Sequence, residues 1–229
     1  EEIHWKTTAK RGRPVTKVDQ VERTQEVYVL LDISRLSARP VPRADGAPAV
    51  PALEQYLSAT LALGLAAEPQ GDLFGLLVFG DKVGSFVRAR NGAAHYHACR
   101  DTLYTLQPQL VSPDYEEVCT FVRLRLRRRT LLIFLTALDN PELASGFVKS
   151  VELVRRQHLT LVNMLQPPGV EPLFSAANAK GADDLYQRLG GHLAWQNLRE
   201  LGKVLQRRGV HFSLLKNEQF STELVSQYL

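Results

Sequence analysis

Short apolar runs separated by helical patterns constrain the fold of this chain more than any other feature. The runs are VYVLLDI, LFGLLVF, TLLIFLTAL, LTLVNML and VHFSLL. Each has the length and aliphatic or β-branched character of a strand covered on both faces, as central strands of parallel sheets are. Because helical patterns lie between most of them, the order predicts an α/β fold: a doubly wound, mostly parallel sheet flanked by helices, with right-handed crossovers.

The segments between these runs give the expected helices and loops. Helical spacing of apolar residues is found at 52–67, 93–106, 115–127, 143–157 and 183–208. The last helix is expected to be broken or bent at Gly190 and Gly191. Residues 81–87 are expected to pair with the preceding strand as a hairpin-like edge strand. The Pro- and Ala-rich segment 38–51 lacks periodicity and is expected to be a long loop.

Two parts of unequal size are expected along the chain. Residues 1–25 mix aromatic, basic and β-branched residues around a turn signal at Gly12 to Pro14, and are expected to form an extended arm or the end of an upstream β region. With 229 residues, of which 45% are hydrophobic, the chain can bury one substantial core. Residues 26–229 are therefore expected to be one domain.

The composition limits the partners of the chain. Its formal charge of +4 comes from Lys and Arg dispersed among many acids, so nucleic acid is not an expected partner. The basic series from Arg123 to Arg129 could hold phosphate, but a solvated helix end is the preferred interpretation. Two isolated cysteines, Cys99 and Cys119, indicate a reducing compartment. No apolar run reaches the roughly 20 residues of a membrane span, so membrane attachment would need a segment outside this sequence.

Polar side chains follow the first strand and the strand at 131–136, where a sheet of this kind binds ligands. Asp32, Ser34 and Asp139 are hard oxygen donors that suit Mg²⁺ or Mn²⁺ better than zinc. The alternative is structural: Asp32 would cap the following turn, and Asp139 would be a helix N-cap before Pro141. The residues expected to contact a partner at this edge are Asp32, Ser34, Ser37, Asp114, Thr136 and Asp139.

These motifs resemble a von Willebrand factor A domain, with a strand ending in Asp-x-Ser and a later apolar strand ending in Thr-x-x-Asp. In that family the metal site uses Asp-x-Ser-x-Ser, which Asp32 and Ser34 match. Position 36 is Leu36, however, and Ser37 comes one residue late. The aspartate that the family places after the later strand aligns with Ala137. The resemblance therefore implies a degenerate form of the metal-ion-dependent adhesion site.

Longer segments resemble the domain-of-unknown-function 58 family, which is a bacterial group. They are IHWKTTAKRGRPVTKVDQVERTQEVYVLLDIS, PDYEEVCTFVRLRLRRRTLLIFLTALDNP and the closing LYQR, L-x-x-RGV and YL. The resemblance covers nearly the whole chain, and its most specific part is the arm with the pattern IHW-K-x-x-A-K-R-G. The resemblance implies a von Willebrand factor A-like domain on the cytoplasmic side, membrane-tethered through upstream residues, and encoded beside MoxR-type AAA+ ATPases.

Two functions from different classes follow from the residues and the resemblance together. The first is a protein-interaction domain without catalytic activity, which binds a MoxR-type AAA+ ATPase or its client at the sheet-end loops. The second is a Mg²⁺-dependent hydrolase of phosphate esters that uses the same oxygens. No G-x-S-x-G elbow, phosphate-binding loop or dinucleotide fingerprint accompanies them, so the interaction domain is favoured.

Overall fold

The computed structural model of the chain describes residues 2–3, 16–17, 24–42, 48–173, 175 and 182–229. Its centre is a six-stranded sheet. The strands are β3 (Glu26–Asp32), β6 (Leu73–Phe79), β7 (Val83–Arg90), β8 (Leu131–Leu135), β9 (Leu159–Leu165) and β10 (Val210–Leu215). Their order across the sheet is β10-β9-β8-β3-β6-β7, and only β7 runs antiparallel to its neighbour. The predicted doubly wound, mostly parallel sheet and the predicted edge strand are confirmed.

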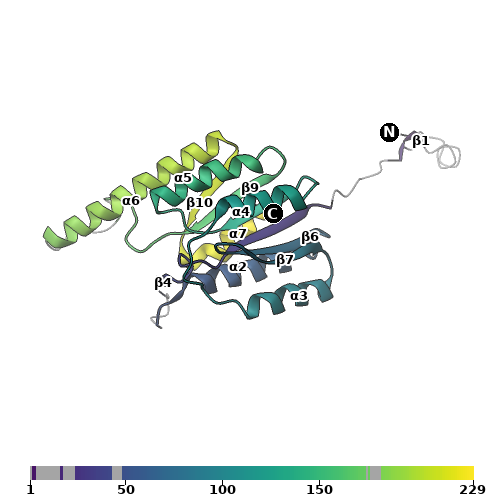
Figure 1. The fold of residues 1–229 in the computed structure, drawn as a ribbon, viewed down its shortest axis with the longest axis horizontal. Helices are drawn as coiled ribbons and strands as arrows, with labels where there is room; N and C mark the ends of the chain where they lie inside the picture. Colours follow the sequence, from purple (N-terminus) through teal and green to yellow (C-terminus); the bar gives the residue numbers. More distant parts are fainter. Residues whose placement is uncertain (1, 4–15, 18–23, 43–47, 174, 176–181) are drawn as a thin grey trace.

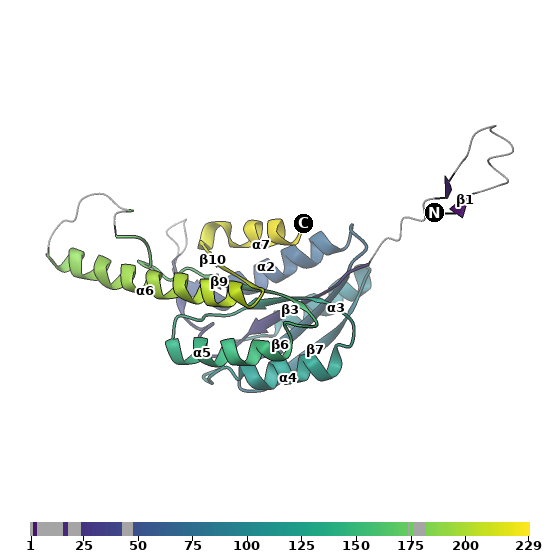
Figure 2. The same cartoon turned by 90° about the horizontal axis from the view of Figure 1, so that it is seen from above.

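Helices cover both faces of this sheet (Figures 1 and 2). The helices on one face are α2 (Ala52–Ala67), α3 (Ala93–Tyr104) and α7 (Phe220–Tyr228). On the other face lie α4 (Tyr115–Arg125), α5 (Pro141–Ser150), the short 3-10 helix η1 (Val151–Leu153) and α6 (Ala182–Arg207). Each face has its own hydrophobic core. Since every residue of β8 is buried, its continuous apolar sequence reflects cover on both sides.

The structure differs from the predicted helices in three places. The fifth helical pattern does not break at Gly190 and Gly191, because α6 runs as one helix through both. The missing side chain of Gly191 instead leaves room for the Gly169 carbonyl oxygen, which a Cβ would meet at 1.9 Å. The helix expected at 143–157 is shorter: α5 begins at Pro141 and ends at Ser150, and η1 follows it.

The third correction is α7, which was not predicted and which follows another short 3-10 helix, η2 (Asn217–Gln219). Its nine residues bury only Phe220 and Leu224, a pattern too short to stand out in the sequence. The ring of Phe220 packs against Tyr56 of α2 with ring centres 5.5 Å apart. Contact with α2 therefore stabilises this last helix, as expected for a helix of such length.

Two short strand pairs lie outside the main sheet. In residues 1–25, expected to form an extended arm or the end of an upstream β region, β1 (Glu2–Ile3) pairs antiparallel with β2 (Thr16–Lys17), and most of the arm lies outside the described residues. In the expected loop 38–51, β4 (Pro40–Val41) pairs antiparallel with β5 (Val50–Pro51). Among the described residues, no helix is both long enough and apolar enough to cross a membrane.

Candidate functional site at the carboxyl ends of β3 and β8

The order of strands reverses beside β3, and this reversal places the candidate site. From β3 the chain first adds β6 on one side and later adds β8 on the other. The carboxyl ends of β3 and β8 therefore lie next to each other with their following loops diverging, which is where open α/β sheets bind ligands. Asp32 ends β3 and Thr136 directly follows β8, so both expected site residues are brought to this point.

A chain of hydrogen bonds joins three side chains there. Asp32 Oδ1 accepts from the Ser34 backbone N–H at 2.8 Å, and Asp32 Oδ2 accepts from the Thr136 hydroxyl at 2.5 Å. The Tyr115 hydroxyl lies 2.9 Å from the Thr136 hydroxyl. Because the one Thr136 proton is directed at the carboxylate, Tyr115 donates to Thr136. Both oxygens of the Asp32 carboxylate are thus already hydrogen-bonded within the protein.

This chain of hydrogen bonds is buried, which shifts the acidity of its members. The side chains of Asp32 and Thr136 are fully inaccessible, and Tyr115 is 4% exposed. Burial raises the pKa of the Asp32 carboxyl above its usual value, against the hydrogen bonds from Thr136 and Ser34 and the charge of Arg39. Burial also holds the pKa of Tyr115 well above its usual value, and the negative charge of Asp32 adds to this effect. Tyr115 therefore stays a hydrogen-bond donor.

The two serines shape the turn that follows β3. The Ser34 hydroxyl oxygen accepts from the Leu36 backbone N–H at 3.3 Å. The Ser37 hydroxyl and backbone N–H both donate to the Ser34 carbonyl, at 2.8 and 3.0 Å. Both serine side chains are buried. Their oxygens are thus used within the turn itself, in the manner expected of serines in local turns.

The two remaining expected residues, Asp114 and Asp139, lie at the surface. Asp114 is the N-cap of α4, where its side chain accepts from the Glu117 backbone N–H at 3.0 Å. Asp139 forms an ion pair with Arg39, which reaches over from the loop after β3. The structural alternative, in which Asp139 is the N-cap of α5, is wrong. That position belongs to Asn140, whose side chain accepts from the first backbone N–H groups of the helix.

The von Willebrand factor A resemblance implies a metal here, but the residues present do not fit a divalent cation. Asp32 is the only carboxylate in the buried network, and both its oxygens already accept hydrogen bonds. Leu36 belongs to the hydrophobic core on the α4 side, and Ala137 also has no oxygen in its side chain. Asp139 is engaged by Arg39. A Mg²⁺ ion is usually held by one or two carboxylates and keeps several of its waters. Asp32, Ser34 and Thr136 are fully buried and bonded to one another or to their own turn, so they leave no access for a hydrated ion.

Tyr115 and Arg39 are members of the site that the sequence patterns did not indicate. Tyr115 stands in the first turn of a helix, where its apolar ring is explained by packing alone. Arg39 lies in the Pro-rich segment, far in the sequence from its partner Asp139. In both cases the relevant contact joins residues more than 20 positions apart, so no local spacing could reveal it.

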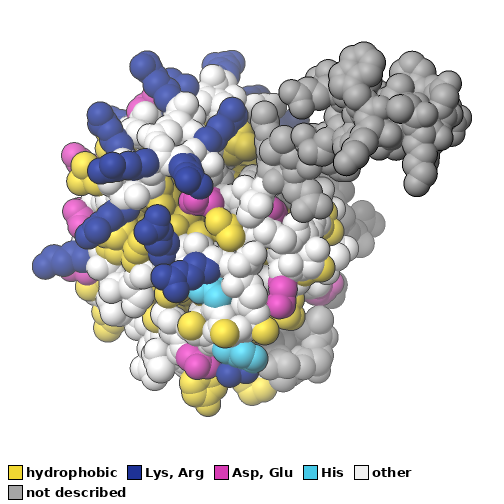
Figure 3. Space-filling model, turned by 90° about the vertical axis from the view of Figure 1, so that its right-hand side faces the viewer, with side chains coloured by type: hydrophobic (Ala, Val, Ile, Leu, Met, Phe, Trp, Pro, Cys, Tyr) yellow, Lys and Arg dark blue, Asp and Glu magenta, His cyan; other side chains and the backbone are white. Residues whose placement is uncertain are grey.

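Positive side chains gather over one part of the surface (Figure 3). Hydrogen bonds also bring together the ends of α4 and α6 and the segment after η1, which carry several of the arginines. The Gln157 side chain donates to the Leu126 and Arg127 carbonyls, and Arg155 donates to the Arg208 carbonyl. Arg155 and Arg208 also pair with Glu152. Arg123 and Arg125 lie in the last turn of α4, where they complement the helix dipole, as the preferred interpretation expects. Arg127, Arg128 and Arg129 follow the helix, in the segment before β8.

Comparison with solved structures defines the class of fold. The von Willebrand factor type A protein from Catenulispora acidiphila matches with a TM-score of 0.53 at 8% identity, over 89% of this chain and 42% of that chain. BatB from Bacteroides thetaiotaomicron matches with a TM-score of 0.54 at 14% identity, over 89% of this chain and 98% of that one. The PilB minor pilin from Streptococcus sanguinis matches with a TM-score of 0.57 at 11% identity, over 93% of this chain and 62% of that one. The chain therefore has a von Willebrand factor A fold.

The family follows from the sequence. The family described as "Protein of unknown function DUF58" matches residues 1–171, and this chain belongs to it. No curated protein matches the chain. The chain spans less than half of the Catenulispora acidiphila protein and nearly all of BatB. At these low identities, the likeness to solved structures establishes the fold.

Proposed function

We propose that this chain is a protein-interaction domain that binds its partner at the carboxyl ends of β3 and β8. The observation that carries the proposal is the Arg39–Asp139 ion pair, which joins the loops following these strands across the surface. The side chains of the pair are 42% and 27% exposed, so a partner can reach both. Beneath the pair, the buried hydrogen bonds of Asp32 and Thr136 fix the ends of the two strands. The contact surface is therefore preorganised.

A groove next to the ion pair supports the same proposal. It has a volume of about 420 Å³ and lies between α5 and α6, with Asp139 at its rim. Its apolar lining comes from Leu138, Ala144, Val148, Leu201 and Val204. An apolar anchor ringed by charged groups is the usual arrangement at the centre of a protein interface. A partner side chain entering this groove would bring its backbone over the ion pair.

The proposed partner is a MoxR-type AAA+ ATPase, the class that the DUF58 resemblance implies. Of the residues expected to contact it, Asp32, Ser34, Ser37 and Thr136 are buried. They are assigned the role of holding the loops in place. Direct contact is assigned to the surface residues Asp114 and Asp139, together with Arg39.

Charge reversal at Asp139 tests this assignment. The Asp139→Lys variant is expected to weaken capture of a purified MoxR-type ATPase from the same genome about tenfold, the effect of losing roughly 1.4 kcal/mol at an interface. Its free energy of unfolding should fall by at most about 1 kcal/mol, since the lost pair is partly exposed. Capture is measured by a quantitative pull-down and stability by urea denaturation.

The matched control is Asp101→Lys, which reverses the same charge in the exposed Arg100–Asp101 pair of α3. This variant should capture the ATPase as the wild type does. Equal capture by the Asp139 and Asp101 variants would remove the sheet-end loops from the interface.

The competing proposal, a Mg²⁺-dependent phosphate-ester hydrolase, has less support from the site. The Ser34 hydroxyl is buried and bonded to its own turn. The cysteine thiols offer no substitute nucleophile, because burial raises the pKa of Cys99 to about 11 and that of Cys119 to about 12. We therefore propose that the chain is not an enzyme at this site.

Metal titration distinguishes the two functions. Calorimetry with Mg²⁺ or Mn²⁺ is expected to show no heat beyond dilution, because the Asp32 carboxylate is inaccessible to solvent and already bonds to Ser34 and Thr136. Neither ion should raise the melting temperature of the wild type more than that of Asp32→Asn. A metal-dependent rise that Asp32→Asn abolishes, together with turnover of p-nitrophenyl phosphate, would establish the hydrolase instead.

A further inference from the structure

The outer edge of β10 has a regular backbone and pairs with no other strand among the residues that the structure describes. β10 lies at one end of the sheet order and pairs with β9 through an unbroken register of six residues. The Leu215 carbonyl accepts from the Gln166 backbone N–H at 2.8 Å, so the polar backbone groups of Leu215 point toward β9. Since these directions alternate along a strand, Phe212 and Leu214 direct their N–H and C=O groups away from β9, to the open edge.

The opposite edge of the sheet is built differently. β7 carries two register shifts against β6, and its sequence VGSFVRAR includes Arg88 and Arg90. Irregular pairing and charged side chains are the usual protection of an edge strand against pairing with another chain. β10, with the sequence VHFSLL, has neither irregular pairing nor Lys, Arg or Pro. Its edge is thus suited to accept another strand.

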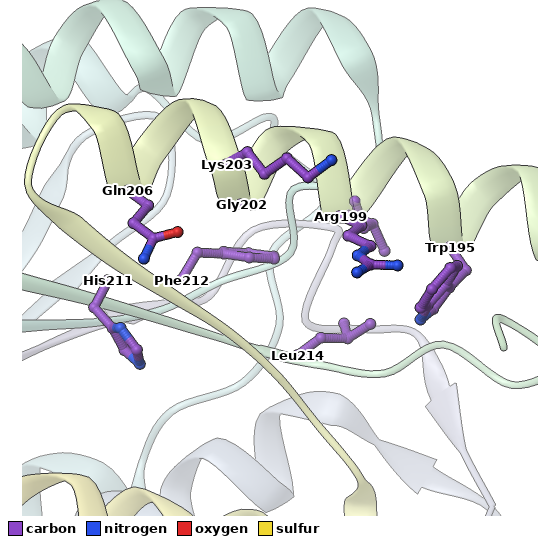
Figure 4. Close-up of a pocket in the computed structure, with 9 residues that line it drawn as sticks. Trp195, Arg199, Gly202, Lys203, Gln206, His211, Phe212 and Leu214 are labelled. Atoms are coloured by element: carbon purple, nitrogen blue, oxygen red, sulfur yellow. The ribbon is translucent and has the colours of Figure 1, made fainter. Parts of the chain in front are cut away.

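A groove of ≈ 440 Å³ runs between this edge and α6 (Figure 4). Its apolar surface comes from Phe212 and Leu214 of the strand and from Trp195 of the helix. Phe212 and Leu214 pack on the α6 side of the sheet. The same two residues therefore present their side chains to the groove and their backbone to the open edge. A strand added at this edge would place every second side chain in the groove.

The wall of the groove that α6 provides is positively charged. Arg199 lies over the Trp195 ring at 5.2 Å, and Lys203 follows one helical turn later. Lys203 pairs with Glu200 at 2.7 Å, but both side chains are more than half exposed, so this pair is weak and easily exchanged. Residues four apart on a helix are separated by about 6 Å along its axis, and alternate residues of a strand by about 6.7 Å. Two acidic side chains at alternate positions would therefore match the two cations.

We propose that the open edge of β10 and the adjoining groove bind an extended peptide with acidic residues at alternate positions. The peptide adds to the sheet as a further strand, and the outward backbone groups of Phe212 and Leu214 pair with it. Its acidic side chains pair with Arg199 and Lys203, and an apolar or aromatic side chain occupies the Trp195 end of the groove. This site is separate from the loops at the carboxyl ends of β3 and β8, and it does not depend on the function proposed for them.

Synthetic peptides test each component of this proposal. The probe is a fluorescein-labelled peptide of sequence Phe-Thr-Glu-Thr-Glu-Thr, and binding to the full chain is followed by fluorescence anisotropy. A peptide with Lys in place of both Glu residues should bind at least about tenfold more weakly, because it meets Arg199 and Lys203 with like charge. A peptide N-methylated at alternate backbone positions should also lose binding, because it cannot complete the strand pairing.

Protein variants test the same pairing from the other side. Leu214→Pro removes an N–H that faces the open edge, where proline is tolerated, while Leu214→Ala removes only the side chain. Leu214→Pro should bind the Glu peptide at least about tenfold more weakly than Leu214→Ala. The N-methylated peptide provides the same comparison if Leu214→Pro does not fold. Arg199→Ala with Lys203→Ala should abolish the preference for Glu over Lys.

Three results would overturn the proposal. The first is equal binding of the Glu and Lys peptides, and the second is full binding of the N-methylated peptide. The third is concentration-dependent self-association of the peptide-free chain in sedimentation experiments, lost in Leu214→Pro but kept in Leu214→Ala. That result would assign the edge to a second copy of the chain.

Discussion

Replacing Thr136 by Val is expected to lower the free energy of unfolding by about 1.5–3 kcal/mol, the range for a hydrogen bond to a charged group. Val nearly keeps the shape of Thr but cannot donate, so Asp32 Oδ2 loses the donor that lies 2.5 Å away. The Tyr115 hydroxyl loses this 2.9 Å contact at the same time and keeps only the Ala137 carbonyl, 3.4 Å away. All three side chains are buried, so water does not readily replace the lost contacts. Urea denaturation of the two proteins gives the difference.

The size of this loss is expected to depend on pH. Burial raises the pKa of Asp32 in the folded protein, and the Thr136 hydrogen bond opposes that rise. A raised folded-state pKa gives stability that is complete below the unfolded-state pKa of about 3.9 and is lost as the pH rises through the folded-state value. Without Thr136 the folded-state pKa rises further. The destabilisation of Thr136→Val should therefore be smallest in acid and grow toward neutral pH.

Two variants identify the group responsible. Thr136→Ser keeps the hydroxyl and should recover most of the stability at all pH values. In the Asp32→Asn background, the effect of Thr136→Val should no longer vary with pH, because the titrating carboxyl is absent. A pH-dependent difference that persists in this background would assign the titration to another group.

The strands of the fold could be predicted from the sequence because burial on both faces leaves a local mark. VYVLLDI and TLLIFLTAL are apolar except for Asp32, Thr130 and Thr136, and β3 and β8 are buried as those runs predict. Strand order is not local, yet the alternation of strands and helices restricted it to a doubly wound sheet. The nine-residue helix α7 escaped prediction because its position depends on contact with α2.

The candidate site was only partly predictable for a related physical reason. Asp32 and Thr136 stand at strand ends, so the rule that ligands gather there brought them together correctly. The same rule could not show that their side chains point into the protein and bond to each other. It also could not find Arg39, whose contact with Asp139 spans 100 positions. Sequence position was enough to bring these candidate residues to one edge of the sheet, but three-dimensional contacts decided which of them are buried and which are accessible.

The buried hydrogen bonds depend on a cluster of aromatic rings, and Phe147→Ala is expected to remove its centre. Phe147 is fully buried, with ring centres 5.1 Å from Tyr115 and 5.3 Å from Phe134, both in edge-to-face arrangements. The expected loss is about 3–5 kcal/mol, from the lost apolar burial and the cavity that remains. Phe147→Leu fills part of that cavity and should cost less. The comparison is made by urea denaturation at neutral pH.

The same variant tests whether packing positions the site. If the Phe147 ring holds Tyr115 against Thr136, the cavity should loosen the hydrogen bond between them, and Thr136→Val should then cost less in the Phe147→Ala background. Contacting residues typically show couplings of about 0.5–3 kcal/mol in such a double-mutant cycle. Simple additivity would mean that the hydrogen bonds hold Tyr115 without help from the rings. A coupling of the expected size would mean that the α5 side of the core, through Phe147, sets the geometry beneath the Arg39–Asp139 surface.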